Sequence, residues 1–111
     1  MVDDGSEVAT KALHLAINLV RARECRLRCV IAVANPEDAA EQRERRICEL
    51  LSYGRKAEFS TLRNPVRFAL IHALRILGPG LVVMPCSGKF GTGADVCDLV
   101  NELPNPILLV H

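Results

Sequence analysis

The chain has 111 residues and half of them are apolar, so it can bury one hydrophobic core but is too short for two domains. We therefore expect a single domain over residues 1–111. The 14 basic and 13 acidic residues leave a net charge of +1, which excludes the strong positive field typical of nucleic-acid-binding proteins. The longest apolar runs have about five residues, far fewer than the roughly 18 to 20 that cross a bilayer, so direct membrane insertion is not expected.

The first helix and strand are predicted by a change in apolar spacing. From Ser6 onward, apolar residues recur every three or four positions, which predicts a helix over residues 6–24. Residues 27–33 are apolar apart from Arg28 and predict a buried strand.

The middle of the chain predicts an outer helix and an edge strand. Residues 36–51 are heavily charged, so the helix that they predict has only a narrow apolar stripe. Residues 56–62 alternate polar and apolar side chains, which indicates a strand at the edge of the sheet. The narrow apolar stripe of the predicted helix over residues 36–51 consists of Ile47, Leu50 and Leu51.

The second half repeats the alternation of helix and strand. The helix that follows Pro65 has too many apolar positions for one stripe and is expected to be well buried up to its end at Gly78. A strand over residues 81–84, a helix over 94–103 and a strand over 107–110 complete the order.

Strands that alternate with helices of crossover length predict an α/β fold, a three-layer α/β/α sandwich around a parallel sheet. Only Met1 and Val2 precede the polar run that starts the first helix, and two residues are too few for a buried strand. The sequence therefore predicts a sheet of four strands that lacks an opening strand.

The chain resembles the universal stress protein family at both ends. The start, Asp4-Gly5-Ser6-Glu7, is similar to the segment that follows the family's first strand. The stretch from Met84 through Gly88-Lys89-Phe90-Gly91 to the closing strand 107–110 is similar to its nucleotide loop and last strand. The resemblance implies a five-stranded parallel sheet whose first strand is central. Because that strand is predicted to be missing here, we expect preceding residues of a longer polypeptide, or a partner chain, to supply it.

The resemblance also implies a binding site for AMP or ATP. The corresponding residues are Asp4, or Asp3 as the weaker alternative, at the base end of the nucleotide, and Gly88, Gly91, Gly93 and Ala94 around its phosphates. This loop departs from the family's pattern, because only Thr92 separates the second and third glycines, and an alanine stands where the family has a hydroxyl residue. The glycines are also explained by a tight turn between a strand and a helix.

No catalytic or metal-binding constellation is evident. Cys86 follows a strand as a phosphatase nucleophile does, but Thr92 stands where such a site requires arginine. Cys25 and Cys29 have no second pair of ligands at metal-site spacing. Five cysteines without regular spacing indicate reduced thiols and a cytoplasmic protein, and most of them are expected to be small buried side chains: Cys25, Cys29, Cys48, Cys86 and Cys97.

Two hypotheses about function follow. The first is a non-catalytic regulatory or interaction domain, for example in the cytoplasmic region of a membrane transporter, that forms a homodimer through the edge of strand 107–110. The second is a stand-alone stress-response protein that binds an adenine nucleotide.

Overall fold

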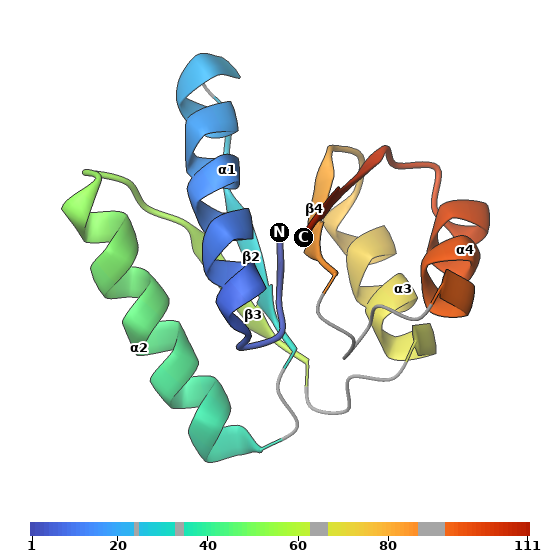
Figure 1. Cartoon of the computed structure of the whole chain (residues 1–111), viewed down its shortest axis with the longest axis horizontal. Coiled ribbons are helices and arrows are strands. Elements are labelled where there is room, and N and C mark those ends of the chain that lie inside the picture. The colour runs from blue at the N-terminus through green and yellow to red at the C-terminus, as the bar shows by residue number, and fades with distance from the viewer. Residues whose placement is uncertain (24, 33–34, 63–66, 87–92) are drawn as a thin grey trace.

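Strands and helices alternate through the whole described part of the chain (Figure 1). The computed structural model describes residues 1–23, 25–32, 35–62, 67–86 and 93–111. Its elements are β1 (Val2–Asp3), α1 (Glu7–Arg23), β2 (Arg28–Ile31), α2 (Pro36–Ser52), β3 (Glu58–Thr61), α3 (Arg67–Leu77), β4 (Val82–Pro85), α4 (Gly93–Glu102) and β5 (Ile107–Val110).

The strands pair in parallel. Within the described residues they form one ladder in the order β1-β2-β3 and a second ladder of β4 and β5. Val2 of β1 pairs with Val30 of β2 and also packs with Val82 and Met84 of β4 in one apolar cluster. The strands therefore follow the order β3-β2-β1-β4-β5 in space, with a seam between β1 and β4 where the ladder is interrupted.

The prediction that the chain lacks an opening strand was wrong. The amino group of Met1 donates to the carbonyl of Arg28 at 2.7 Å, and the amide of Val30 donates to the carbonyl of Met1 at 2.9 Å. Val2 is fully buried between the two helical layers. Because a strand needs only main-chain partners and cover for its apolar side chain, two residues are enough here to form β1. The sheet thus has its central strand, although β1 is only two residues long.

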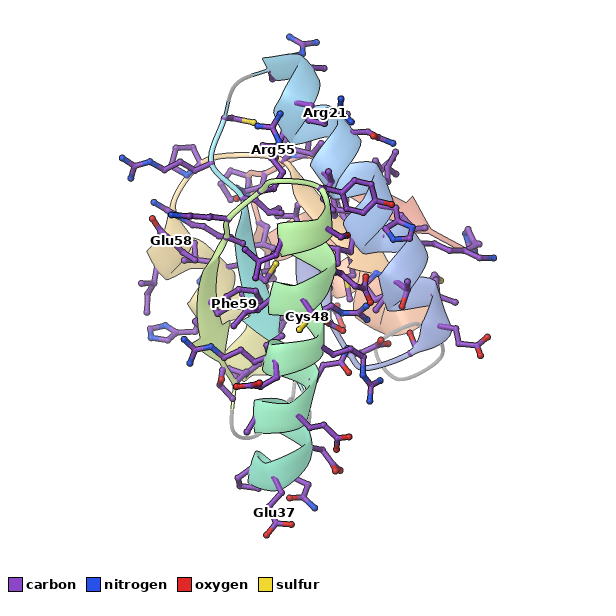
Figure 2. The ribbon with its side chains drawn as sticks, turned by 90° about the vertical axis from the view of Figure 1, so that its left-hand side faces the viewer. Arg21, Glu37, Cys48, Arg55, Glu58 and Phe59 are labelled. Atoms are coloured by element: carbon purple, nitrogen blue, oxygen red, sulfur yellow. The ribbon has the colours of Figure 1, made fainter. Side chains whose placement is uncertain are left out.

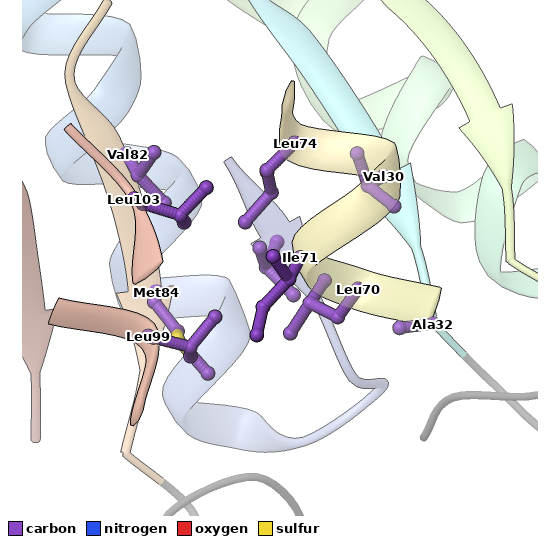
Figure 3. Packing of buried hydrophobic residues seen from close by; sticks show 10 residues of the cluster. Val30, Ala32, Leu70, Ile71, Leu74, Val82, Met84, Leu99 and Leu103 are labelled. Carbon is purple, nitrogen blue, oxygen red and sulfur yellow. The ribbon is translucent and has the colours of Figure 1, made fainter. Parts of the chain in front are cut away.

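Helices cover both faces of the sheet, which confirms the three-layer α/β architecture. Figure 3 shows Leu70, Ile71 and Leu74 of α3 packed between β2, β4 and α4 on one face. On the other face, residues of α1 and α2 pack on the sheet in a second cluster. Its buried members are Met1, Ala12, Leu13, Ala16, Ile17, Leu27, Cys29, Leu50 and Val83.

The predicted edge strand is confirmed. Among the strands that the structure describes, β3 pairs with β2 alone and lies at the end of the three-stranded ladder. Glu58 is exposed and Phe59 is half-buried beside α2, where the Arg43 guanidinium lies 5.8 Å from the centre of the Phe59 ring (Figure 2). The alternation of polar and apolar residues in this segment therefore predicted its position at the edge of the sheet correctly.

The buried faces of two helices differ from the prediction. In α2, Leu50 is buried as expected, but Leu51 is 61% exposed and Ile47 is only half-buried, because the inner face carries two polar residues that are described below. In α3, one face is buried, whereas Ile76 is 70% exposed, so the helix is not buried on all sides. No helix among the described residues is both long and apolar enough to span a membrane.

Candidate functional site

The first part of the predicted site lies where β1 ends and α1 begins. Asp4 is almost fully buried, and its Oδ1 accepts hydrogen bonds from the amide of Ser6 at 3.0 Å and from Ser6 Oγ at 2.5 Å. Ser6 Oγ in turn accepts from the amide of Ala9 at 3.2 Å, which caps the first turn of α1. The structure therefore places Asp4 at the carboxyl end of β1, where its carboxylate helps to anchor a helix start.

Asp3, the last residue of β1, is fully buried. Its carboxylate accepts from Arg46 Nε at 2.6 Å, from Gln42 Nε2 at 3.1 Å and from the amide of Gly5 at 2.9 Å. A buried carboxylate needs such a set of donors, because an unpaired charge in an apolar interior is strongly unfavourable. These contacts tie β1 to the inner face of α2.

Arg46 extends this cluster to α1. Its Nη1 donates to Thr10 Oγ1 at 3.0 Å and to Glu49 Oε1 at 3.1 Å. Burial acts to lower the pKa of Arg46, but the hydrogen bond and charge of Asp3, together with Glu49, outweigh it and raise the pKa above its ordinary value. The guanidinium stays charged, so an ion pair holds β1, α1 and α2 together.

The sequence analysis missed this cluster, although a signal for it exists. Gln42 and Arg46 are four residues apart on the helix and share a face with Ala39 and Leu50, which are both buried. Two polar residues between apolar ones on one helix face indicate buried partners on another element.

The second part of the predicted site lies after β4. Gly93 and Ala94 form the start of α4, whereas Gly88 and Gly91 lie outside the described residues. β1 and β4 lie side by side, and Asp4 directly follows β1 at the carboxyl edge of the sheet. Anionic ligands bind at this edge in α/β proteins, next to helix starts.

The cysteines are less uniformly buried than predicted. Cys29 is buried in β2, and burial raises the pKa of its thiol to about 11. Cys25 and Cys48 are exposed, which corrects the prediction that they are buried side chains, and Cys86 is partly exposed. The side chain of Cys97 lies outside the described residues. Cys25 lies between α1 and β2, and Cys48 lies on the outer face of α2.

The remaining candidate ligands do not converge in the described part of the chain. No group of three or more His, Cys, Asp or Glu side chains there is close enough to hold a metal ion. His14 lies on the exposed side of α1. Its Nε2 is 3.8 Å from Glu49 Oε2, and the ring centres of His14 and Tyr53 are 5.7 Å apart. His72 is exposed on α3.

Comparison with known proteins bears on the fold. No family model matches the chain, and no curated protein matches it. Among solved structures, the crystal structure of a protein from the universal stress protein family of Burkholderia pseudomallei is similar, with a TM-score of 0.72 and 22% sequence identity. The match covers 97% of this chain and 90% of that chain. At this level of identity the similarity concerns the fold, and the fold implied by the sequence resemblance is confirmed: this chain has the fold of the universal stress proteins.

Proposed function

We propose that the chain is a regulatory or interaction domain without catalytic activity and that it acts by pairing with a second copy through β5. The observation that supports this proposal is the open apolar edge of that strand. β5 pairs with β4 alone within the described residues, and Ile107, Leu108, Leu109 and Val110 are all only half-buried.

The main chain of β5 favours such pairing. The carbonyl of Pro106 accepts from the amide of Val82 in β4 at 2.9 Å, and the carbonyl of Val110 accepts from the amide of Cys86, the residue after β4, at 2.8 Å. Because neighbouring residues of a strand direct their main-chain groups to opposite sides, those of Ile107 and Leu109 face away from β4. An apolar edge without a charged residue is a template for another strand.

This proposal is tested by the mass of the protein in solution. Leu108 is half-buried and lies in neither core cluster formed by the described residues, so Leu108→Lys should leave the fold intact while it places a charge on the apolar edge. The matched control is Val100→Lys, which changes an exposed apolar residue of α4. We expect multi-angle light scattering to show a dimer for the parent and the control and a monomer for Leu108→Lys. A monomeric parent at high concentration would refute pairing through β5.

The setting of such a domain is part of the proposal. A domain that works by pairing suits the cytoplasmic region of a larger membrane protein, such as a transporter, whose subunits it would hold together. The reduced thiols that the irregular cysteine spacing predicts would suit this setting.

The alternative function is adenine-nucleotide binding by a stand-alone stress-response protein. It is favoured by the position of Asp4 directly after β1 and of Gly93 and Ala94 at the start of α4, and the proposed phosphate-binding residues are Gly88, Gly91, Gly93 and Ala94. Calorimetric titration with AMP and with ATP tests it. Saturable binding that Gly91→Asp abolishes would establish the alternative, and absence of heat at millimolar nucleotide would exclude it. Release of phosphate from ATP would contradict the absence of catalysis.

A further inference from the structure

The links between each helix and the next strand meet at one edge of the sheet. Arg28 at the start of β2 contacts two of them: its Nε lies 3.3 Å from Glu58 Oε2 at the start of β3, and its Nη1 donates to the carbonyl of Leu77 at the end of α3 at 2.7 Å. The end of α4 joins them, because Glu102 Oε2 accepts from Arg75 Nη2 at 3.1 Å. We call this surface the amino edge, since strands begin there. It consists of residues 20–23, 25–28, 49–58, 74–82 and 99–107.

The amino edge carries exposed apolar side chains. Every large apolar side chain that is exposed among the described residues lies in the last turn of a helix or in the link that follows it. Ile76 at the end of α3 is the most exposed of them, at 70%. These residues are Leu51, Tyr53, Ile76, Leu81 and Val100. Exposed apolar side chains scattered singly over a surface are ordinary, but their concentration at one edge indicates an interaction surface.

Basic side chains surround these apolar ones. In the described part of the amino edge the basic residues outnumber the acidic ones, and the acidic ones, Glu49, Glu58 and Glu102, each form an ion pair with an arginine. Figure 2 shows Arg21 and Arg55 at this same end of the molecule. The basic residues are Arg21, Arg23, Arg26, Arg28, Arg55, Lys56 and Arg75. The amino edge therefore concentrates positive charge, although the whole chain carries only +1.

This mixture fits a membrane surface better than a protein partner. The centre of a protein interface is a continuous apolar patch in which charged residues are depleted. At the amino edge the apolar residues come from separate links, and charged residues stand beside them: Arg55 and Lys56 follow Tyr53 in a single link. Single apolar side chains among basic ones suit the headgroup layer of a bilayer, which accepts apolar side chains and offers phosphates to the basic ones.

We propose that the amino edge binds the surface of a membrane that contains anionic lipids. The exposed apolar side chains enter the headgroup layer, where tyrosine is a favoured residue, and Tyr53 lies at that depth. The arginines and Lys56 meet the lipid phosphates around them. The contact is peripheral and needs no membrane-spanning segment. It does not depend on pairing of two copies through β5.

Cosedimentation with vesicles tests the proposal. We expect the chain to sediment with vesicles of equal parts phosphatidylcholine and phosphatidylserine and to stay in solution with phosphatidylcholine alone. A rise in salt from about 0.1 M to about 0.5 M should release most of the bound chain, because salt screens the attraction between the charges. Failure to sediment with the anionic vesicles would overturn the proposal. If polyglutamate bound and the vesicles did not, the amino edge would be a site for an acidic protein instead.

Two matched pairs of variants locate the contact. Lys56→Glu at the amino edge should weaken binding to anionic vesicles about fivefold or more. Lys11→Glu makes the same change of charge at an exposed position near the start of α1 and should have a much smaller effect. Ile76→Ser should also weaken binding, because an apolar anchor is lost, and His72→Ser, one turn earlier on the same helix, is its control. Equal affinities within either pair would contradict the proposal.

Tyr53 reports the depth of the contact directly, since the chain has one tyrosine and no tryptophan. We expect its fluorescence to be quenched when the anionic vesicles contain a lipid with a nitroxide group near the ester end of its acyl chain. The free chain mixed with the same amount of neutral vesicles that contain this lipid should keep its fluorescence. A chain that sediments with the anionic vesicles and still keeps its full tyrosine fluorescence would contradict placement of the amino edge on the membrane.

Discussion

At the carboxyl end of β1, the carboxylate of Asp3 accepts hydrogen bonds from Arg46, Gln42 and Gly5. Arg46 also reaches Thr10 and Glu49, so a single buried side chain connects the first strand with both helices of one layer. A buried ion pair contributes little compared with apolar packing, but removal of one partner leaves the other charge uncompensated. The joint between β1 and the helices is therefore sensitive to single substitutions.

We expect Asp3→Ala to lower the free energy of unfolding by about 3 to 5 kcal/mol, because the buried Arg46 guanidinium loses its main partner. The matched control is Glu41→Ala, which breaks the exposed pair with Arg45 and should change stability by less than about 1 kcal/mol. Urea denaturation measures both. Arg46→Met in the Asp3→Ala background should recover part of the loss, and additive losses in the double variant would contradict the pairing.

At the scale of elements, α2 has the clearest boundary signals. Asn35 caps the helix, since its Oδ1 accepts from the amide of Glu37 at 2.9 Å, and Pro36 occupies the first helical position. At the other end, Gly54 has a positive φ of 66°, which glycine adopts without strain, and the chain turns there toward β3. These local signals explain why the helix begins where the sequence predicted.

Asn35→Ala should destabilise the protein by about 1 kcal/mol, because an amide in the first turn of α2 loses its partner. Asn35→Ser supplies another side-chain oxygen and should cost much less. Glu44→Ala, at an exposed position in the middle of the same helix, is the control for a change of side chain without loss of a cap. Thermal denaturation followed by circular dichroism compares the three, and an unchanged midpoint in Asn35→Ala would contradict the role of the cap.

The buried face of α2 could not be read from the helix alone. The sequence predicted a stripe that included Leu51, and the structure instead buries Gln42 and Arg46. Apolar periodicity assigns the inner face when the partners are apolar, and here Asp3 on a distant strand makes polar residues suitable for burial. Similarly, β1 was not predicted because its pairing partners lie 28 residues away, at Val30 and Ile31.

At the scale of the whole molecule, two buried groups next to the seam titrate abnormally. Burial lowers the pKa of the Met1 amino group below 8.0, and burial raises the pKa of the Cys29 thiol from 9.0 to about 11. The unfolded chain therefore binds more protons than the folded one just below pH 8, and stability rises with pH there. Between pH 9 and about 11 the unfolded chain has already lost the thiol proton that the folded chain keeps, so stability falls with pH.

We expect urea midpoints of the parent to pass through a maximum between pH 8 and 9. The fall above pH 9 should amount to at most about 3 kcal/mol, from two pKa units at about 1.4 kcal/mol each. Cys29→Ala should lower the urea midpoint at every pH because packing is lost, and it should remove the fall in stability above pH 9 that comes from this thiol. Cys48→Ala changes an exposed thiol and should leave that alkaline fall unchanged. Identical alkaline slopes in the parent and in Cys29→Ala would contradict the assignment.

Local sequence patterns were sufficient to predict the alternation of strands and helices, the parallel α/β class and the edge position of β3, and they carry the resemblance to the universal stress proteins. These properties follow from local spacing of apolar residues and from short motifs, which each segment carries alone. The packed fold was needed to show that Val2–Asp3 forms the central strand and that Asp3 pairs with Arg46. Each of these depends on main-chain or charged groups that meet across the sheet, and such contacts leave no regular spacing in the sequence.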